Sequence, residues 1–466
     1  MWRAAGRGNY SAAMVLFPLF LSCITSVEND GSDPQTATSD TSISSPSGDT
    51  GTESTGATVS EPNVLLLSID TTRADRVNSN GYTGSTTTPN LDALLASGLA
   101  LRNHRSCSTW TMPSFLCVWT GQDALGLGVW VDIERGDDGL DPYPNDELPS
   151  LAWHLGEAGY ATQLVTGNLL LGGAYNMDRG FDDWTRTFNV TETADTGIAE
   201  LERLAADPSP WFLQIHFMAP HKPYNPDPAY LEGDTDCPGH DLTTRDGFAA
   251  FRAPFQQMSD EEQQACLDHL DHLYDALLRE TDRHLQRVLD ALDATGERED
   301  TVIVFVTDHG ESFQEHGFWE HSWGGNVDTL VRSTAGFVHP ALVPAAEHHG
   351  LTTHEDILPT LFTLLGRAVP AGVTGHAVGT AETEAVFQLT YANDATVQPV
   401  ATEDAKLIYR WDQGAAYYDL TTDPMELHDQ WDPTLPEAMA LWEKLEPKVL
   451  ELADRVDDGA KPYFLP

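Results

Sequence analysis

The chain contains 466 residues, with 25 Lys and Arg against 72 Asp and Glu, so its formal net charge is −47 with histidine neutral. This excess of carboxylates excludes a protein that wraps nucleic acid, because phosphate backbones are bound by cationic side chains. The length allows one large α/β domain or several smaller ones, and 41% apolar residues suffice for a sizeable core. We interpret the acidic surface as an adaptation to a salty or extracellular setting; an acidic face for a cationic partner is the alternative.

The N-terminus has the pattern of an export signal. Two arginines precede an apolar run over residues 12–21, which is too short to span a bilayer but suits a secretory signal. Cys23 ends this stretch in a pattern similar to a bacterial lipoprotein signal; because Phe20 stands where that pattern usually has Leu, ordinary cleavage is the alternative. We expect residues 1–23 to be a signal peptide of lipoprotein type. The protein is then exported to the cell envelope and touches the membrane through its lipid only.

A change of composition follows the signal. From residue 25 to residue 61 the chain has no Lys or Arg and consists largely of Ser, Thr, Gly, Asp and Glu. Such a segment buries too little apolar surface to offset its ordering entropy. We predict residues 24–61 to be a disordered tether between the anchor and the folded body.

Four cysteines remain if Cys23 is lipidated, an even number for an oxidising compartment: Cys107, Cys117, Cys237 and Cys266. Three connectivities are possible. We predict the pair Cys237 and Cys266, since one precedes a proline in a loop and the other lies on the next helix; buried free thiols are the alternative.

The elements predicted in the body alternate between strands and helices. Apolar, β-branched runs predict strands buried on both faces at residues 64–69, 212–217 and 302–307. Helices are predicted at residues 91–97, 148–158 and 259–292, the last with a capping box from Ser259 to Glu262. This order implies a doubly wound α/β domain over residues 62–375, with helices on both faces of a mostly parallel sheet. Polar loops at residues 132–144 and 234–255 show no readable pattern.

The pattern changes in the last part of the chain. Short strands are predicted at residues 384–391, 406–411 and 415–420, and a closing helix at residues 437–456. We therefore predict a C-terminal subdomain with a small antiparallel sheet over residues 376–466.

Chemistry-bearing residues follow two of the predicted central strands. Asp70 follows the first, and Asp308 with His309 follows the strand at residues 302–307. Ligands of doubly wound sheets bind at the carboxyl ends of the strands, where these side chains converge. A strand-end Asp by itself is often a helix cap, but two carboxylates and an imidazole together indicate a site for one divalent cation.

Thr111 is the candidate nucleophile. Pro113 suits the first turn of a helix, which places the Thr111 hydroxyl at a helix N-terminus, a favourable position for an anionic ester. Coordination to the cation lowers the pKa of such a hydroxyl. The alternative is that Thr111 only caps the helix.

The ordered motifs resemble the sulfatase family of the alkaline-phosphatase superfamily, from about residue 62 to residue 430. They are NVLLLSIDTTRAD at residues 63–75, TPNLD at 88–92, TMPS at 111–114, PHKPY at 220–224, DHGE at 308–311, DILPT at 356–360, and YDL at 418–420 with DP at 423–424. The resemblance implies that Asp70, Asp308, His309 and Thr111 hold the metal and that Thr111 occupies the nucleophile position.

The resemblance also implies roles for residues around the ester. His221 contacts the ester and the leaving group and is expected to protonate or polarise the leaving oxygen. His321 falls where relatives carry a Lys or His that binds the transferred anion. Lys222 adds positive charge for substrate binding, with a solvated loop lysine as the alternative. His316 and Glu320 are expected to be supporting or surface residues.

Two departures from the family pattern matter. Sulfatases proper have Cys or Ser, oxidised to formylglycine, where Thr111 stands, and an Arg where Phe115 stands. A formylglycine hydrate has two hydroxyls and expels sulfate by cleaving its own C–O bond, whereas threonine has one. The covalent intermediate of a threonine is released only by attack at sulfur or phosphorus. This favours phosphate esters over sulfate esters as substrates. Thr71 replaces a second metal-binding Asp, so calcium, the metal of typical sulfatases, gives way to Mn²⁺, Zn²⁺ or Mg²⁺.

We therefore expect an exported, metal-dependent hydrolase that cleaves a sulfate or phosphate ester through Thr111, on a substrate such as a sulfated or phosphorylated glycan or lipid. One alternative is a phosphodiesterase or phospho-group transferase with the same site. The other is a catalytically silent envelope or glycan-binding relative.

The net charge predicts how activity on an anionic ester depends on salt concentration. An acidic shell repels anionic esters, and salt screens this repulsion over roughly 8–10 Å, so the site must be an electropositive exception built from the metal, His221, His321, Arg73 and Lys222. We expect kcat/KM for an anionic ester to rise between low and moderate NaCl concentration. A steady fall over the same range contradicts this electrostatic picture.

Overall fold

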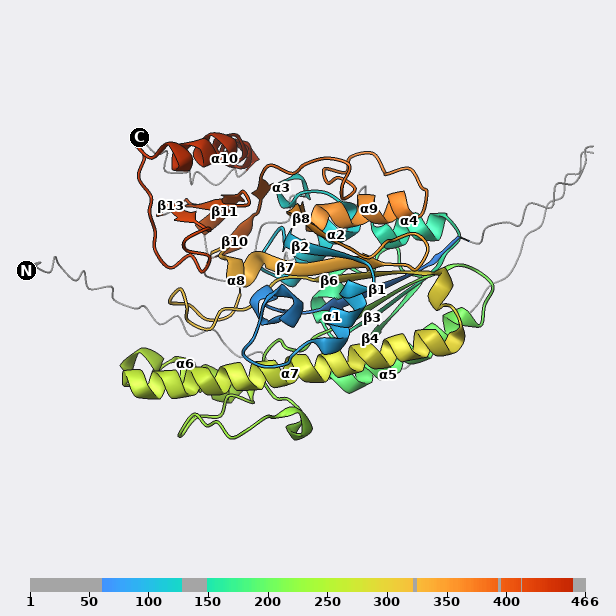
Figure 1. Ribbon diagram of the computed structural model, residues 1–466, viewed down its shortest axis with the longest axis horizontal. Coiled ribbons are helices and arrows are strands. Elements are labelled where there is room, and N and C mark those ends of the chain that lie inside the picture. The colour runs from blue at the N-terminus through green and yellow to red at the C-terminus, as the bar shows by residue number, and fades with distance from the viewer. Residues whose placement is uncertain (1–60, 128–148, 322–324, 393–394, 412, 456–466) are drawn as a thin grey trace, which may run out of the picture. The chain divides into compact units, whose positions relative to one another are not determined.

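Apolar runs form the central strands of a sheet that has eight strands in the described part of the chain (Figure 1). The computed structural model describes residues 61–127, 149–321, 325–392, 395–411 and 413–455. The strands are β1 (Asn63–Ile69), β2 (Leu99–Arg105), β3 (Ala161–Thr166), β4 (Asp183–Arg186), β5 (Trp211–Phe217), β6 (Thr301–Thr307), β7 (Arg332–Val338) and β8 (Ala346–Thr353). Their order is β4-β3-β5-β1-β6-β7-β2-β8, and only β7 runs antiparallel to its neighbours. The predicted α/β fold is confirmed.

Alternation along β1 decides which side chains meet which helices. Val64 and Leu66 pack in the core beneath α2 (Thr111–Thr120), α4 (Leu151–Glu157) and α9 (Ile357–Leu364). Leu65 and Leu67 pack in the opposite core with α1 (Pro89–Ala96), α5 (Val190–Ala205) and α7 (Asp260–Thr295). Figure 1 shows these two helix layers on either side of the sheet. Because side chains of a strand alternate, the even-numbered residues that follow Leu66 face the α2 layer.

Helix α7 begins as predicted. Ser259 accepts a hydrogen bond from the backbone of Glu262, whose side chain accepts from the backbone of Ser259, so the capping box is confirmed. The helix contains 36 residues and therefore extends over about 54 Å.

The expectation that residues 234–255 form a loop without a pattern is partly wrong. Helix α6 (Arg245–Arg252) lies in this segment and buries two phenylalanines. The other such loop, residues 132–144, lies outside the described residues.

A second, antiparallel sheet lies in the C-terminal part. It comprises β9 (Val386–Phe387), β10 (Thr390–Ala392), β11 (Ala395–Ala401), β12 (Ala405–Arg410) and β13 (Gly414–Asp419), followed by α10 (Pro436–Arg455). The single strand predicted at residues 384–391 is two short pieces, and β11 was not predicted. The remaining short helices are α3 (Ala124–Leu127) and α8 (Asp328–Val331). The boundary at residue 376 stays a prediction.

Two disulfides link the four cysteines of the body. Cys237 is bonded to Cys266, as predicted, and Cys107 is bonded to Cys117. The alternative of buried free thiols is therefore wrong. The first bridge ties the segment before α6 to α7, and the second encloses Thr111.

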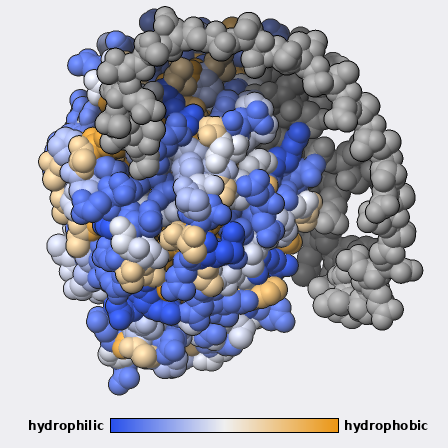
Figure 2. All heavy atoms as spheres, turned by 90° about the vertical axis from the view of Figure 1, so that its right-hand side faces the viewer, coloured by the Kyte–Doolittle hydropathy of each residue, from blue (hydrophilic) through white to orange (hydrophobic). Residues whose placement is uncertain are grey.

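The part of the surface seen in Figure 2 is largely polar. Figure 2 shows one face that is mostly hydrophilic, with apolar side chains scattered singly over it. Within the described residues, no helix has the length and apolar character needed to cross a membrane.

A buried ionic network joins the two sheets. Lys406 on β12 is fully buried, and its Nζ lies 2.8 Å from both Asp328 Oδ1 and Glu426 Oε1. Asp328 also pairs with Arg105 at the end of β2. Burial raises the pKa of Glu426 to about 7 against the opposing charge of Lys406. The network therefore depends on the lysine to hold two carboxylates in the interior.

Lys406→Met is expected to lower the free energy of unfolding by about 3–5 kcal/mol, because removal of one partner leaves buried charge uncompensated. Lys444→Met is the matched control, since its pair with Glu384 is exposed and is expected to contribute less than about 1 kcal/mol. Urea unfolding followed by tryptophan fluorescence measures both. Equal, small losses would show that the buried network does not hold the sheets together.

Candidate active site

Two carboxylates lie side by side at the carboxyl edge of the main sheet. Asp70 and Asp308 directly follow β1 and β6, which are parallel neighbours in register, and both side chains are buried. Asp308 Oδ1 accepts hydrogen bonds from the backbone N–H groups of Thr71, at 3.0 Å, and His309, at 2.8 Å. Asp70 Oδ1 and Asp308 Oδ2 are buried and have no hydrogen-bond partner among the described residues.

The environments of the two carboxylates push their pKa values apart. Burial and the nearby charge of Asp70 raise the pKa of Asp308 well above its usual range. Burial also opposes ionisation of Asp70, but the hydrogen bond with His216 and the neighbouring histidines outweigh it and hold the pKa of Asp70 below its usual range. Two adjacent buried carboxylates need either a shared proton or a cation. The two unpartnered oxygens therefore fit a divalent cation.

His309 supplies a third ligand atom of the right kind. Its Nδ1 lies 2.9 Å from the carbonyl oxygen of Gly310, so Nδ1 carries the proton and Nε2 keeps its lone pair. Burial holds the pKa of His309 well below its usual range, which keeps the ring neutral. Nε2 lies 3.4 Å from Asp308 Oδ2 and 3.8 Å from Asp70 Oδ1. Atoms that bind one metal ion at about 2.1 Å lie about 3–4 Å apart, so these residues fit a shared ion.

Thr111 lies at the edge of this group. Helix α2 begins at Thr111, and its N-cap residue is Trp110, so the alternative that Thr111 is the cap is wrong. Thr111 Oγ1 lies 3.5 Å from both Asp70 Oδ2 and His309 Nε2. The structure thus brings together all four residues for which the sequence predicts metal binding.

Asn168 is a member of the site that the sequence reasoning missed. It lies two residues after the end of β3, and its Nδ2 donates to Asp70 Oδ2 at 2.6 Å and to Thr111 Oγ1 at 3.0 Å. Its Oδ1 accepts from the backbone N–H of Leu170 at 2.9 Å, which fixes the orientation of the amide. The available signal was a polar residue just after the apolar segment that forms β3.

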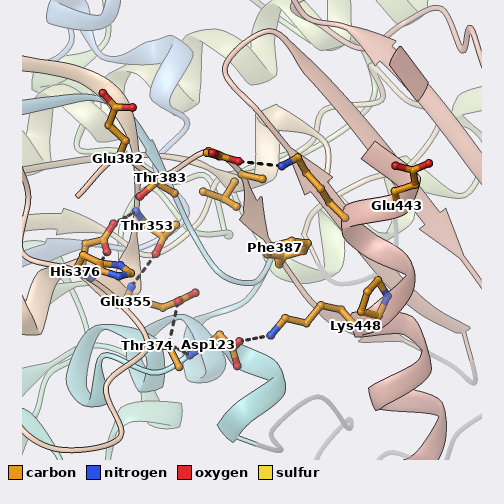
Figure 3. Close-up of a pocket in the computed structure, with 17 residues that line it drawn as sticks. Asp123, Thr353, Glu355, Thr374, His376, Glu382, Thr383, Phe387, Glu443 and Lys448 are labelled. Carbon is orange, nitrogen blue, oxygen red and sulfur yellow. Dashed lines mark hydrogen bonds and ion pairs between the residues drawn. The ribbon is translucent and has the colours of Figure 1, made fainter. Parts of the chain in front are cut away.

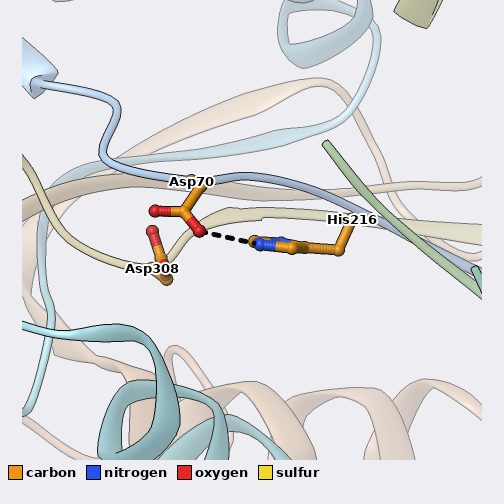
Figure 4. Close-up of side chains that lie close together, drawn as sticks. All are labelled: Asp70, His216 and Asp308. Carbon is orange, nitrogen blue, oxygen red and sulfur yellow. Dashed lines mark hydrogen bonds and ion pairs between the residues drawn. The ribbon is translucent and has the colours of Figure 1, made fainter. Parts of the chain in front are cut away.

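His216 was also missed, because it stands inside a run predicted as a buried strand. Figure 4 shows His216 beside one oxygen of Asp70, while the other oxygen of Asp70 lies on the side of Asp308. His216 Nε2 is 3.1 Å from Asp70 Oδ2, and Asp70, His216 and Asp308 together have the spacing of metal ligands. The signal was an imidazole in a buried strand whose one other polar residue is Gln214.

The segment before Thr111 is fixed from two directions. The disulfide between Cys107 and Cys117 closes it onto α2. The C-terminal sheet also holds it, because Leu389 donates its backbone N–H to the carbonyl of Cys107 and Gln388 donates its side-chain amide to the carbonyl of Ser106. The C-terminal part of the chain thus helps to place the candidate nucleophile.

Three histidine rings line up next to the carboxylates. The ring of His321 lies 4.5 Å from that of His309 and 5.2 Å from that of His221, centroid to centroid. His321 Nδ1 lies 3.0 Å from Glu311 Oε1; burial opposes protonation, but the Glu311 charge outweighs it and raises the pKa of His321. His221 Nδ1 lies 2.8 Å from the carbonyl of Lys222, and burial lowers the pKa of His221.

The cationic side chains expected at the site are compensated by carboxylates. Lys222 forms an ion pair with buried Glu320, which also accepts from Arg252 at 2.7 Å. Arg73 pairs with Asp75 and Glu315. The positive charges that we expected from Arg73 and Lys222 are therefore offset by neighbouring carboxylates, and Glu320 is buried. A role for Lys222 in substrate binding stays a prediction. His316 is partly buried and bonded to the carbonyl of Met425, away from the carboxylates.

A separate crevice lies at the far end of α2. Its volume is about 700 Å³. Figure 3 shows that α10 contributes Glu443 and Lys448 to its lining, and that Asp123 and Glu355 lie on the side of the main sheet's domain. Thr111 stands at the opposite end of the 10-residue helix, which spans about 15 Å. The crevice shares no lining residue with the site around Asp70.

Comparison with known proteins agrees with this geometry. The family model described as Sulfatase matches residues 62–367. A choline-sulfatase of Rhizobium meliloti (strain 1021) is 24% identical, and the match covers 79% of this chain and 82% of the relative. The structure of BT4656 in complex with its substrate D-glucosamine-2-N,6-O-disulfate has a TM-score of 0.67 at 18% identity, covering 86% of this chain and 99% of that chain. The phosphonate monoester hydrolase of Agrobacterium radiobacter has a TM-score of 0.63 at 20% identity, covering 85% and 96%.

The fold and the family match together define the class. The chain belongs to the sulfatase family, within the alkaline-phosphatase superfamily, and is a sulfatase-family hydrolase.

The Glu320 ion pairs make a prediction about anion binding. Glu320→Gln keeps a hydrogen-bonding side chain but removes the charge that neutralises Lys222 and Arg252. We expect inorganic phosphate to bind about three- to tenfold more tightly, which corresponds to about 0.7–1.4 kcal/mol. Titration calorimetry measures the change, with Glu382→Gln in the distant crevice as the control. Unchanged phosphate affinity in Glu320→Gln would mean that these cations do not act on a bound anion.

Proposed function

We propose that the protein is a metal-dependent hydrolase that transfers the sulfuryl or phosphoryl group of an ester first to Thr111 and then to water. The observation that carries this proposal is the position of Thr111 Oγ1, 3.5 Å from Asp70 Oδ2 and from His309 Nε2. A hydroxyl that lies beside His309 Nε2 and on the Asp70 carboxylate, whose other oxygen is unpartnered, is well placed for activation by a cation.

Asp70, Asp308, His309 and Thr111 would hold the cation. Such an ion, when bound, lowers the pKa of the Thr111 hydroxyl and offsets negative charge on the transferred group. Asn168 donates to Thr111 Oγ1 and so stabilises the oxygen as it loses its proton. A set with two carboxylates and an imidazole suits Mn²⁺ or Zn²⁺ better than calcium or Mg²⁺, which prefer oxygen ligands.

Hydrogen bonds suggest how protons move. In the first step, the Thr111 hydroxyl gives its proton to Asp70 Oδ2, toward which it donates, and Oγ1 forms a bond to sulfur or phosphorus while the bond to the leaving oxygen breaks. The leaving oxygen takes a proton from His321, which is held against the Glu311 carboxylate and suits this role better than His221, to which the sequence resemblance gives it.

In the second step, His221 Nε2 accepts a proton from the attacking water, because Nδ1 carries the ring proton toward the Lys222 carbonyl. The bond from sulfur or phosphorus to Thr111 Oγ1 breaks, and Oγ1 takes its proton back from Asp70.

The nucleophile narrows the substrate class. Threonine has one hydroxyl and cannot expel sulfate by the route open to formylglycine, so its ester is resolved by attack at sulfur or phosphorus. We therefore propose phosphorus esters, including diesters and phospho-group transfer, alongside sulfate esters. The likeness to a phosphonate monoester hydrolase supports the phosphorus branch. The likeness to a protein complexed with a disulfated glucosamine supports a glycan as the alcohol part.

We also propose that the protein is exported and lipid-anchored. The segment on which this rests, residues 1–60, lies outside the described residues. Support comes from the two disulfides of the body, since such bonds persist in oxidising compartments.

The proposed function is tested with 4-nitrophenyl sulfate, phosphate and bis(4-nitrophenyl) phosphate, together with metal analysis of the same preparation. We expect turnover of at least one phosphorus ester, a loss of about 1,000-fold or more in Thr111→Ala, and retention within about tenfold in Thr111→Ser, which keeps a hydroxyl. Removal of metal by a chelator should abolish turnover, and Mn²⁺ or Zn²⁺ should restore it.

Thr120→Ala is the matched control, because Thr120 stands at the other end of α2, where its hydroxyl bonds the carbonyl of Leu116 and the backbone N–H of Gln122. It should keep wild-type turnover. Hydrolysis that survives in Thr111→Ala would rule out this nucleophile. Rapid turnover of the aryl sulfate with Thr111 intact would overturn the argument from the missing second hydroxyl.

A further inference from the structure

A buried histidine lies directly behind the candidate metal site. His216 is fully buried on β5, and the parallel register of β1 and β5 makes Ser68 its direct partner. Asp70 stands two residues after Ser68, so all three side chains face the α2 layer. The ring of Phe115 from α2 covers His216 edge-on, with centroids 5.1 Å apart.

The hydrogen bonds of His216 fix its protons. Nε2 lies 3.1 Å from the Asp70 carboxylate, which only accepts, so Nε2 carries the proton. Nδ1 lies 3.0 Å from Ser68 Oγ and accepts the hydroxyl hydrogen. In this state Nε2 has no lone pair to offer a metal, although its distance to the carboxylates matches that of a ligand.

The two oxygens of Asp70 therefore have different surroundings. Oδ2 receives hydrogen bonds from His216 and Asn168 and a longer one, of 3.5 Å, from Thr111, whereas Oδ1 has no hydrogen-bond partner among the described residues. His309 Nε2, which keeps its lone pair, lies on the side of Oδ1. Donors on the outer oxygen of a metal-binding carboxylate fix its orientation.

We propose that His216 is a positioning residue, which orients Asp70 through a Ser68–His216–Asp70 chain of hydrogen bonds and thereby sets the affinity of the metal site without binding the metal. This inference rests on the proposed metal-dependent function. It assigns the single imidazole ligand to His309.

Metal affinity tests the proposal in the absence of substrate. Zn²⁺ is titrated into the full folded chain, stripped of metal, in competition with a chromophoric chelator. We expect His216→Ala to weaken Zn²⁺ binding about 10- to 100-fold. His216→Gln should stay within about threefold of wild type, because its amide can donate to Asp70 and accept from Ser68. His104→Ala is the control, since His104 is equally buried on β2 and its Nδ1 bonds Thr352 instead.

X-ray absorption at the zinc edge separates positioning from coordination. We expect one imidazole in the zinc shell of the wild type and the same shell in His216→Gln. Two imidazoles in the wild type, or a loss in His216→Gln as large as in His216→Ala, would overturn the proposal in favour of direct coordination. Equal affinities in His216→Ala and His104→Ala would overturn it as well. If the wild-type protein binds no Zn²⁺, the proposed metal-dependent function is contradicted instead.

Discussion

The repulsion between two buried carboxylates is the constraint on which the site depends. Asp70 and Asp308 end adjacent parallel strands, so the sheet itself places them next to each other in the interior. The backbone N–H groups of Thr71 and His309 satisfy one oxygen of Asp308. His216 and Asn168 satisfy one oxygen of Asp70. What is left is one unpartnered oxygen on each carboxylate, and a cation between them relieves the repulsion that burial makes severe.

Cationic side chains around the two carboxylates are also paired with opposite charges. Lys222 and Arg252 are both paired with Glu320, and Arg73 is paired with Asp75 and Glu315. In a chain with a net charge of −47, the proposed function therefore requires that attraction for an anionic ester come from the proposed cation, from His321 and from amide donors such as Asn168. The groups that attract the anion then lie next to the reacting group, where water is excluded and electrostatic interactions are strong.

Much of the fold could be predicted from the sequence, because its signals are local. The apolar runs that became β1, β5 and β6 end where expected, and the capping box at Ser259 marks the start of α7. Adjacency of the strand ends then follows from the fold class, which is why Asp70 and Asp308 could be paired without coordinates. The helix inside residues 234–255 escaped prediction because its phenylalanines are few and its polar face dominates the composition.

The residues that were missed depend on strand register and not on local pattern. His216 reaches Asp70 because β1 and β5 pair in a particular register, and Asn168 does so because β3 lies beyond β5 in the sheet. A pattern of apolar residues marks a strand but does not say which strand lies beside it. Glu320 likewise meets Lys222 and Arg252 only through loop packing across about 70 to 100 positions of the chain.

The central claim is that one divalent cation is held by Asp70, Asp308 and His309 next to the Thr111 hydroxyl. Anomalous diffraction from crystals grown with Mn²⁺ or Zn²⁺ tests it most directly. The account predicts a single strong peak bounded by Asp70 Oδ1, Asp308 Oδ2 and His309 Nε2, with Thr111 Oγ1 beside it. A peak bonded to His216, or metal-saturated crystals without density between the two carboxylates, would contradict it.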